Sequence, residues 1–141
     1  MRRLSAVILF LAVSAVLVLT VSCGGNSMSM QGRQLQSITV TPKTADAMNF
    51  PGGQVQFSAM GNFNMAPMTA ATPVMWSLSE PMSGMAPGGV TINATTGMAT
   101  CSGFTGTVIV MAMAPAEPLI PLSQMSTMTM NVSGQAQLTC P

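Results

Sequence analysis

Methionine and cysteine are the most conspicuous candidates for reactive or metal-binding residues in this sequence. The chain carries 16 methionines and three cysteines among 141 residues, and it contains no histidine. Thioethers are soft donors, so methionines that meet on one surface could bind Cu(I), and exposed ones could buffer oxidants by forming sulfoxides. The alternative is that methionine takes the place of leucine as a flexible core filler. The closely spaced methionines are Met28/Met30, Met65/Met68, Met82/Met85, Met111/Met113 and Met125/Met128/Met130.

Other reactive groups are scarce. Lys and Arg number four, Asp and Glu number three, and charged residues make up only 5% of the chain. Without histidine, the many serines and threonines lack the usual base that would activate them. Asp46, Glu80 and Glu117 are too scattered for a calcium cage, and the basic footprint of a nucleic-acid-binding protein is missing. We therefore expect a protein that is not an enzyme, needs no cofactor and binds no nucleic acid.

Residues 1–22 have the layout of an export signal. Two arginines follow Met1, an apolar-biased stretch covers residues 4–21, and the small residue Ser22 precedes Cys23. An uncleaved membrane-spanning helix is the alternative, because a stretch of this length could just cross a bilayer.

The stretch LTVSC, residues 19–23, resembles the lipobox of bacterial lipoproteins. This resemblance implies cleavage before Cys23 and attachment of lipid to its thiol, which would anchor the chain to a membrane. Because Gly24 follows the cysteine, the resemblance also implies the outer membrane of the cell envelope, on its periplasmic or surface face.

The residues after Cys23 are rich in Gly, Ser, Asn and Gln and show no apolar periodicity. Residues 23–34 are therefore predicted to be a flexible tether, and residues 35–141 to be one folded domain. Within that domain glycines and prolines recur at short intervals, which leaves little room for helices of normal length.

The segments between these breakers alternate apolar and polar residues, as half-buried strands do. Seven or eight short strands without helices predict an all-β domain, an Ig-like sandwich of two antiparallel sheets with about seven strands. The expected strands are SITVT, QVQFSAM, VMWSLS, GVTIN, TVIVMAMA and TMTMNV, with further segments around Met48 and Phe50 and around Met98.

Alternation along the expected strands predicts which side chains form the core and which face outward. Phe57, Trp76, Val108 and Val110 are predicted to point inward. Met111 and Met113 are then predicted to face outward, beside Met75 on a neighbouring strand, and these three residues are the candidate Cu(I) ligands. Met128 and Met130 share a face with Val132 and are expected inside.

Five segments occur in a characteristic order between Leu35 and Val132: SITVTP, PGGQVQFSA, VMWSLS, GGVTINATTGMAT and GTVIVMAMA. Together they resemble the bacterial Ig-like domains of group 2. In that family a Gly turn precedes the second strand, a Trp of the third fills the core and a Gly opens the sixth. Gly53, Trp76 and Gly106 stand at these positions. The resemblance implies an Ig-like sandwich and, for some members, adhesion or other roles at the cell surface.

Assigning Cys23 to lipid leaves Cys101 and Cys140 as an even pair in an oxidising compartment. Such a pair favours a disulfide, and two free, half-buried thiols are the alternative. We accordingly expect a non-enzymatic, lipid-anchored envelope module that acts as a spacer, scaffold or adhesive surface. Its partners would be the membrane, through the anchor, and a cell-surface protein or polysaccharide. The alternative is a periplasmic protein that binds Cu(I) or buffers oxidants on the same sandwich.

Overall fold

The structure, a computed structural model, describes residues 32–79 and 88–141. The predicted signal segment, Cys23, most of the predicted tether and the pair Met82/Met85 lie outside the described residues. The described residues belong to one unit, residues 32–141, which has a hydrophobic core of its own.

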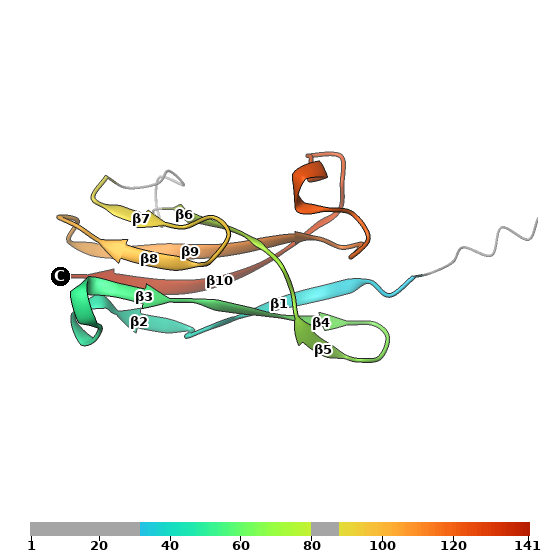
Figure 1. The fold of residues 1–141 in the computed structure, drawn as a ribbon, viewed down its shortest axis with the longest axis horizontal. Coiled ribbons are helices and arrows are strands. Elements are labelled where there is room, and N and C mark those ends of the chain that lie inside the picture. Colours follow the sequence, from blue (N-terminus) through green and yellow to red (C-terminus); the bar gives the residue numbers. More distant parts are fainter. Residues whose placement is uncertain (1–31, 80–87) are drawn as a thin grey trace, which may run out of the picture. The chain divides into compact units, whose positions relative to one another are not determined.

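The described residues form ten strands in three sheets, so the all-β prediction is confirmed (Figure 1). The first sheet contains β1 (Leu35–Thr41), β4 (Ser58–Phe63) and β5 (Thr69–Ala71), and the second contains β3 (Gln54–Gln56), β8 (Met98–Cys101) and β7 (Val90–Ile92). The third contains β2 (Thr44–Asp46), β10 (Asn131–Cys140), β9 (Gly106–Pro115) and β6 (Met75–Ser79). Three short 3-10 helices complete the described elements: η1 (Ala47–Asn49), η2 (Pro51–Gly53) and η3 (Leu122–Gln124).

The three sheets form the two layers of a sandwich. Strands β3 and β4 are separated only by Phe57, whose backbone N–H donates to the Gly97 carbonyl, so the two three-stranded sheets continue into each other. That layer has the order β1, β3/β4, β8, β7, with β5 also paired to β4, and the opposite layer has the order β2, β10, β9, β6. This is the strand order of an Ig-type sandwich. Ten strands appear instead of seven because β1/β2 and β3/β4 are split strands and β5 is additional.

One strand pair departs from the antiparallel prediction. Strand β2 pairs with β10 in parallel, with Thr44 opposite Gln137 and Asp46 opposite Thr139. Only Pro42 and Lys43 separate β1 from β2, and the chain keeps its direction as it passes from one layer to the other (Figure 1). Because no hairpin reverses the chain there, β2 joins the sheet parallel to its neighbour.

The core contains the four residues that the alternation predicted. Phe57 and Trp76 are 1% and 5% exposed, their ring centroids lie 6.4 Å apart, and Val108 and Val110 are fully buried. Trp76 is on β6 and the two valines are on β9, so one layer supplies three of these side chains and the other supplies Phe57.

Gly97 closes a tight turn against this core. The Asn93 side-chain oxygen accepts from the backbone N–H groups of Thr95 and Thr96, and the Gly97 N–H donates to the Asn93 carbonyl. Gly97 has φ +73°, and a Cβ atom there would lie 2.7 Å from Cε2 of Trp76. Both the backbone conformation and the contact with the indole therefore require glycine.

The predicted strand around Met48 and Phe50 is wrong, because η1 and η2 occupy this segment. The Asp46 side chain accepts from the Met48 N–H and caps η1, and Pro51 begins η2. A side chain that bonds to its own nearby backbone competes with strand pairing. The apolar side chains of Met48 and Phe50 consequently face solvent.

The predicted inward placement of Met128 and Met130 is also wrong. These side chains are 97% and 83% exposed, and the last strand begins only at Asn131. Strand β10 pairs with β9 over ten residues, from Asn131 opposite Pro115 to Cys140 opposite Gly106. Its buried face consists of Gly134, Ala136, Leu138 and Cys140. Two of these residues are so small that the strand gives little apolar signal in the sequence.

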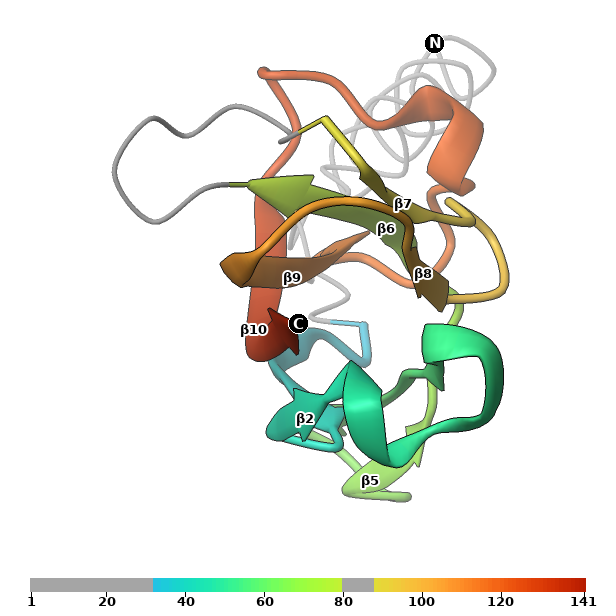
Figure 2. The same cartoon turned by 90° about the vertical axis from the view of Figure 1, so that its left-hand side faces the viewer.

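The sandwich has two distinct ends. At one end, which we call the Arg33 end, lie Arg33, the start of β1, the β4–β5 turn and the loop of residues 116–130 (Figure 1). At the other, the Cys140 end, lie the end of β10, the β8–β9 turn and η1 and η2; Figure 2 looks onto it. Strand β10 runs between the two ends, and its ten residues span about 30 Å.

Candidate functional site

The first candidate site is the Arg33 end, where the chain enters the sandwich. The Arg33 guanidinium carbon lies 3.6 Å from the centroid of the Phe63 ring, and Nη2 donates to the Pro67 carbonyl at 2.7 Å. A guanidinium over an aromatic face is attracted by the ring quadrupole. Its Nε is buried and has no hydrogen-bond partner among the described residues.

Gln34 is fixed at the same place. Its backbone N–H donates to the side-chain oxygen of Asn64, and its carbonyl accepts from the Asn64 N–H. Leu35 then donates to the Ala116 carbonyl at 2.7 Å. Arg33 and Gln34, the last two residues of the predicted tether, are therefore held by the β4–β5 turn.

An apolar cavity of about 230 Å³ lies at this end. Ligand pockets are commonly about 300–1,000 Å³, so this cavity suits one apolar group rather than a whole cofactor. The residues around it include Arg33, Leu35, Phe63, Pro115, Ile120 and Leu122.

The loop of residues 116–130 covers part of this cavity and is itself folded. The Ile120 N–H donates to the Glu117 carbonyl, the Met125 N–H to that of Leu122, and the Thr129 N–H to that of Ser126. Leu122 packs against the core, whereas Leu119, three residues earlier, is 95% exposed. The loop thus presents some apolar side chains to solvent while others hold it to the sandwich.

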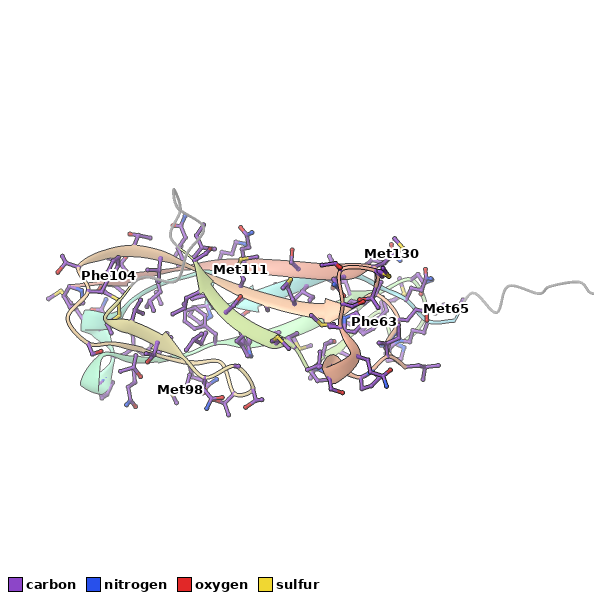
Figure 3. All side chains as sticks on the ribbon, turned by 90° about the horizontal axis from the view of Figure 1, so that it is seen from above. Phe63, Met65, Met98, Phe104, Met111 and Met130 are labelled. Atoms are coloured by element: carbon purple, nitrogen blue, oxygen red, sulfur yellow. A yellow bond between two sulfur atoms is a disulfide. The ribbon has the colours of Figure 1, made fainter. Side chains whose placement is uncertain are left out.

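The second candidate site is the methionine row, which we define as Met75, Met111 and Met113. Met75 of β6 is directly opposite Met113 of β9, and directly opposed residues bring their Cβ atoms within about 5 Å. Met111 is two residues from Met113 on the same face, opposite Ser77, and its sulfur lies 3.8 Å from the Ser79 hydroxyl oxygen. Figure 3 labels Met111 in the middle of the sandwich, away from both ends. The structure brings these three predicted residues onto one outer face.

The two cysteines of the domain are joined at the Cys140 end. Cys101 ends β8 and Cys140 ends β10, with their Cα atoms 5.7 Å apart in a disulfide. The bond connects the two layers of the sandwich, and it is the pairing that the cysteine count favoured.

Lys43 and Asp46 make structural contacts with nearby backbone groups. Lys43 Nζ donates to the Gln135 carbonyl at 2.7 Å, and the Asp46 carboxylate accepts from the Met48 N–H. No three His, Cys, Asp or Glu residues meet within residues 32–79 and 88–141 in a way that could hold a metal ion. No helix in this part of the chain has the length and apolar character needed to cross a bilayer.

Sequence reasoning missed the role of Arg33 and of the loop of residues 116–130. Arg33 is the only arginine after the two at the N-terminus, and its position next to the first strand was the available signal. The sequence contains no signal for the exposure of Leu119, because an apolar residue between prolines is equally compatible with burial.

The fold places the chain among all-β, Ig-type sandwiches. Comparison with protein-family models finds none that matches the sequence, and comparison with curated proteins likewise finds no match.

Proposed function

We propose that this protein is a non-enzymatic, lipid-anchored module of the bacterial cell envelope, acting as a spacer, scaffold or adhesive surface. The observation that carries the proposal is the position of the two ends. The chain enters at the Arg33 end, ten residues after Cys23, and the Cys140 end lies about 30 Å away along β10. A lipid on Cys23 would hold the sandwich near one end and leave the other free.

The Cys140 end has features that suit it to contact a cell-surface protein or polysaccharide. Exposed Met48 lies there on η1, exposed Phe50 lies between η1 and η2, and the disulfide joins the two layers at the same end. A surface held rigid before binding loses less conformational entropy when a partner docks.

The anchor is tested by radiolabelled palmitate in cells that express the full chain. We expect the wild type to incorporate label and to sediment with membranes, and the Cys23→Ser variant to do neither, because only a free thiol at this position accepts the lipid. The Cys101→Ala/Cys140→Ala variant is the matched control and should remain labelled. Labelling that persists in Cys23→Ser would overturn the anchor.

The methionine row supports a second candidate function, Cu(I) binding. Met75, Met111 and Met113 offer three soft thioethers on one face, and Cu(I) prefers sulfur donors. The row faces outward, so it is not required as core filler.

Titration of the chain from Gly24 to Pro141 with Cu(I), in competition with a Cu(I) chelator, tests this function. We expect a micromolar or tighter site that the Met111→Leu/Met113→Leu variant loses, because leucine keeps the apolar volume and removes the donor. Met65→Leu/Met68→Leu, in the β4–β5 turn, is the matched control and should still bind. Equal binding by all three proteins, or none by the wild type, would end the copper proposal.

A further inference from the structure

Fully exposed apolar side chains gather at the Arg33 end of the sandwich. Leu119, Met128 and Met130 are 95%, 97% and 83% exposed, and all three belong to the loop of residues 116–130. Met65 and Met68, also exposed, lie in the β4–β5 turn at the same end, where the Met68 carbonyl accepts from the Phe63 N–H. Figure 3 shows Met65 and Met130 at this end, far from Phe104 at the other.

The loop holds these side chains outward in a defined conformation. Two side-chain hydrogen bonds add to the backbone hydrogen bonds of the loop: the Thr129 hydroxyl and the Asn131 side-chain amide both donate to the Ser126 carbonyl. The Ala116 N–H and the Met130 carbonyl close the base of the loop at 2.8 Å. A loop already ordered loses little conformational entropy when its tip enters another phase.

Charged side chains are few at this end, which favours contact with an apolar phase. Arg33 and Glu117 are its charged residues within the described part of the chain, and the Arg33 guanidinium is already engaged with Phe63 and the Pro67 carbonyl. Among the described residues of this end, Glu117 is the one charged residue that is exposed, whereas Arg33 is half-buried. Moving exposed leucine and methionine side chains out of water lowers the free energy. An ionic partner would find little to bind here.

The short stretch of chain between Cys23 and Arg33 indicates which apolar phase this end would contact. Ten residues separate Cys23 from Arg33, a distance of at most about 35 Å even when fully extended. We propose that the Arg33 end docks onto the lipid bilayer, with Leu119, Met128 and Met130 inserted among the headgroups and the first acyl carbons. Apolar side chains that lie in this interface bind it in proportion to the apolar area they bury. The inference rests on the proposed anchor, which brings this end to a membrane.

The test uses the chain from Gly24 to Pro141, which contains the whole folded unit but neither the signal segment nor Cys23. Vesicles of phosphatidylethanolamine and phosphatidylglycerol are added, and bound protein is measured by flotation. We expect the wild type to bind at millimolar lipid and Leu119→Ser/Met128→Ser/Met130→Ser to bind at least about tenfold more weakly. Met48→Ser/Phe50→Ser, at the Cys140 end, is the matched control and should bind like the wild type.

Hydrogen exchange provides a second readout that does not depend on the variant. Amides of residues 116–130 and 64–68 should exchange more slowly when vesicles are present, and amides of residues 47–53 should be unchanged. Thermal unfolding of the triple variant should match that of the wild type, since the altered side chains make few contacts.

Docking would be overturned by no binding of the wild type, by equal binding of the triple variant, or by protection confined to the Cys140 end. Self-association without lipid that the triple variant abolishes would assign the side chains to a second copy of the chain and equally overturn it. The palmitate experiment is independent. If Cys23 is labelled but the chain from Gly24 to Pro141 does not bind vesicles, the anchor is retained and docking is rejected. If that chain binds vesicles but Cys23 is not labelled, docking is retained and the anchor is rejected.

Discussion

Removing the disulfide is expected to lower the free energy of unfolding of the chain from Gly24 to Pro141 by about 4 kcal/mol. Cys101 and Cys140 are 39 residues apart, and their bond restricts the unfolded chain across a loop of that length. It also joins the two layers, because one cysteine is on β8 and the other on β10. The Cys101→Ala/Cys140→Ala variant, compared with the wild type by urea unfolding, measures the loss.

Reduction of the wild type with a strong thiol reductant is the control for this prediction. Cys140 is only 2% exposed, so alanine also removes a buried sulfur, whereas reduction retains it. We expect reduction to cause most of the loss on its own. A double variant within about 1 kcal/mol of the wild type would show that the bond adds little, since that is the effect of an ordinary point mutation.

Substituting Gly97 with alanine is expected to lower the free energy of unfolding by about 3 kcal/mol. The new Cβ would lie 2.7 Å from Cε2 of Trp76 and 2.8 Å from the Phe57 carbonyl oxygen, both in the core. The backbone at φ +73° adds a second penalty, because alanine avoids this region. Urea unfolding measures the loss, and a shift in the fluorescence of Trp76, the chain's one tryptophan, reports displacement of the ring.

Two glycines provide matched controls for the separate contributions. Gly52 has φ +66° but no atom within 4 Å of a new Cβ, so Gly52→Ala should show the backbone penalty alone, about 1–2 kcal/mol. Gly88 has neither feature, and Gly88→Ala should leave stability nearly unchanged. If Gly97→Ala is no less stable than Gly52→Ala, the close packing of Gly97 against Trp76 is not present in solution.

Much of the fold could be predicted because alternation is a local property of the chain. The segments around Phe57, Trp76, Val108 and Val110 alternate clearly, and their side chains are buried as expected. The same alternation placed Met75 and Met113 on one outer face, where the β6–β9 register brings them opposite each other. Cysteine parity pointed to the Cys101–Cys140 pair without any knowledge of the fold.

The sequence-based predictions failed at strand boundaries and at small residues. Met128 and Met130 follow the alternation of Val132, but β10 begins after them because its pairing with β9 starts at Pro115. The buried face of β10 includes Gly134, where a Cβ would collide with the Ile38 carbonyl oxygen of β1. Glycine was needed there for close approach of two strands, and a glycine in a sequence is equally typical of a turn.

The class of fold, the core side chains and the two faces of the central strands can be inferred from local patterns in the sequence. These features follow from the two-residue period of a strand and from the positions of glycine and proline, which act over a few residues. Three further features emerge only from the folded chain: Arg33 lies over Phe63, the disulfide lies at the opposite end, and the exposed apolar loop residues share the end of Arg33. These loop residues are Leu119, Met128 and Met130. Each of these features depends on residues at least 30 positions apart in the sequence, and an alternation of period two carries no information over such separations.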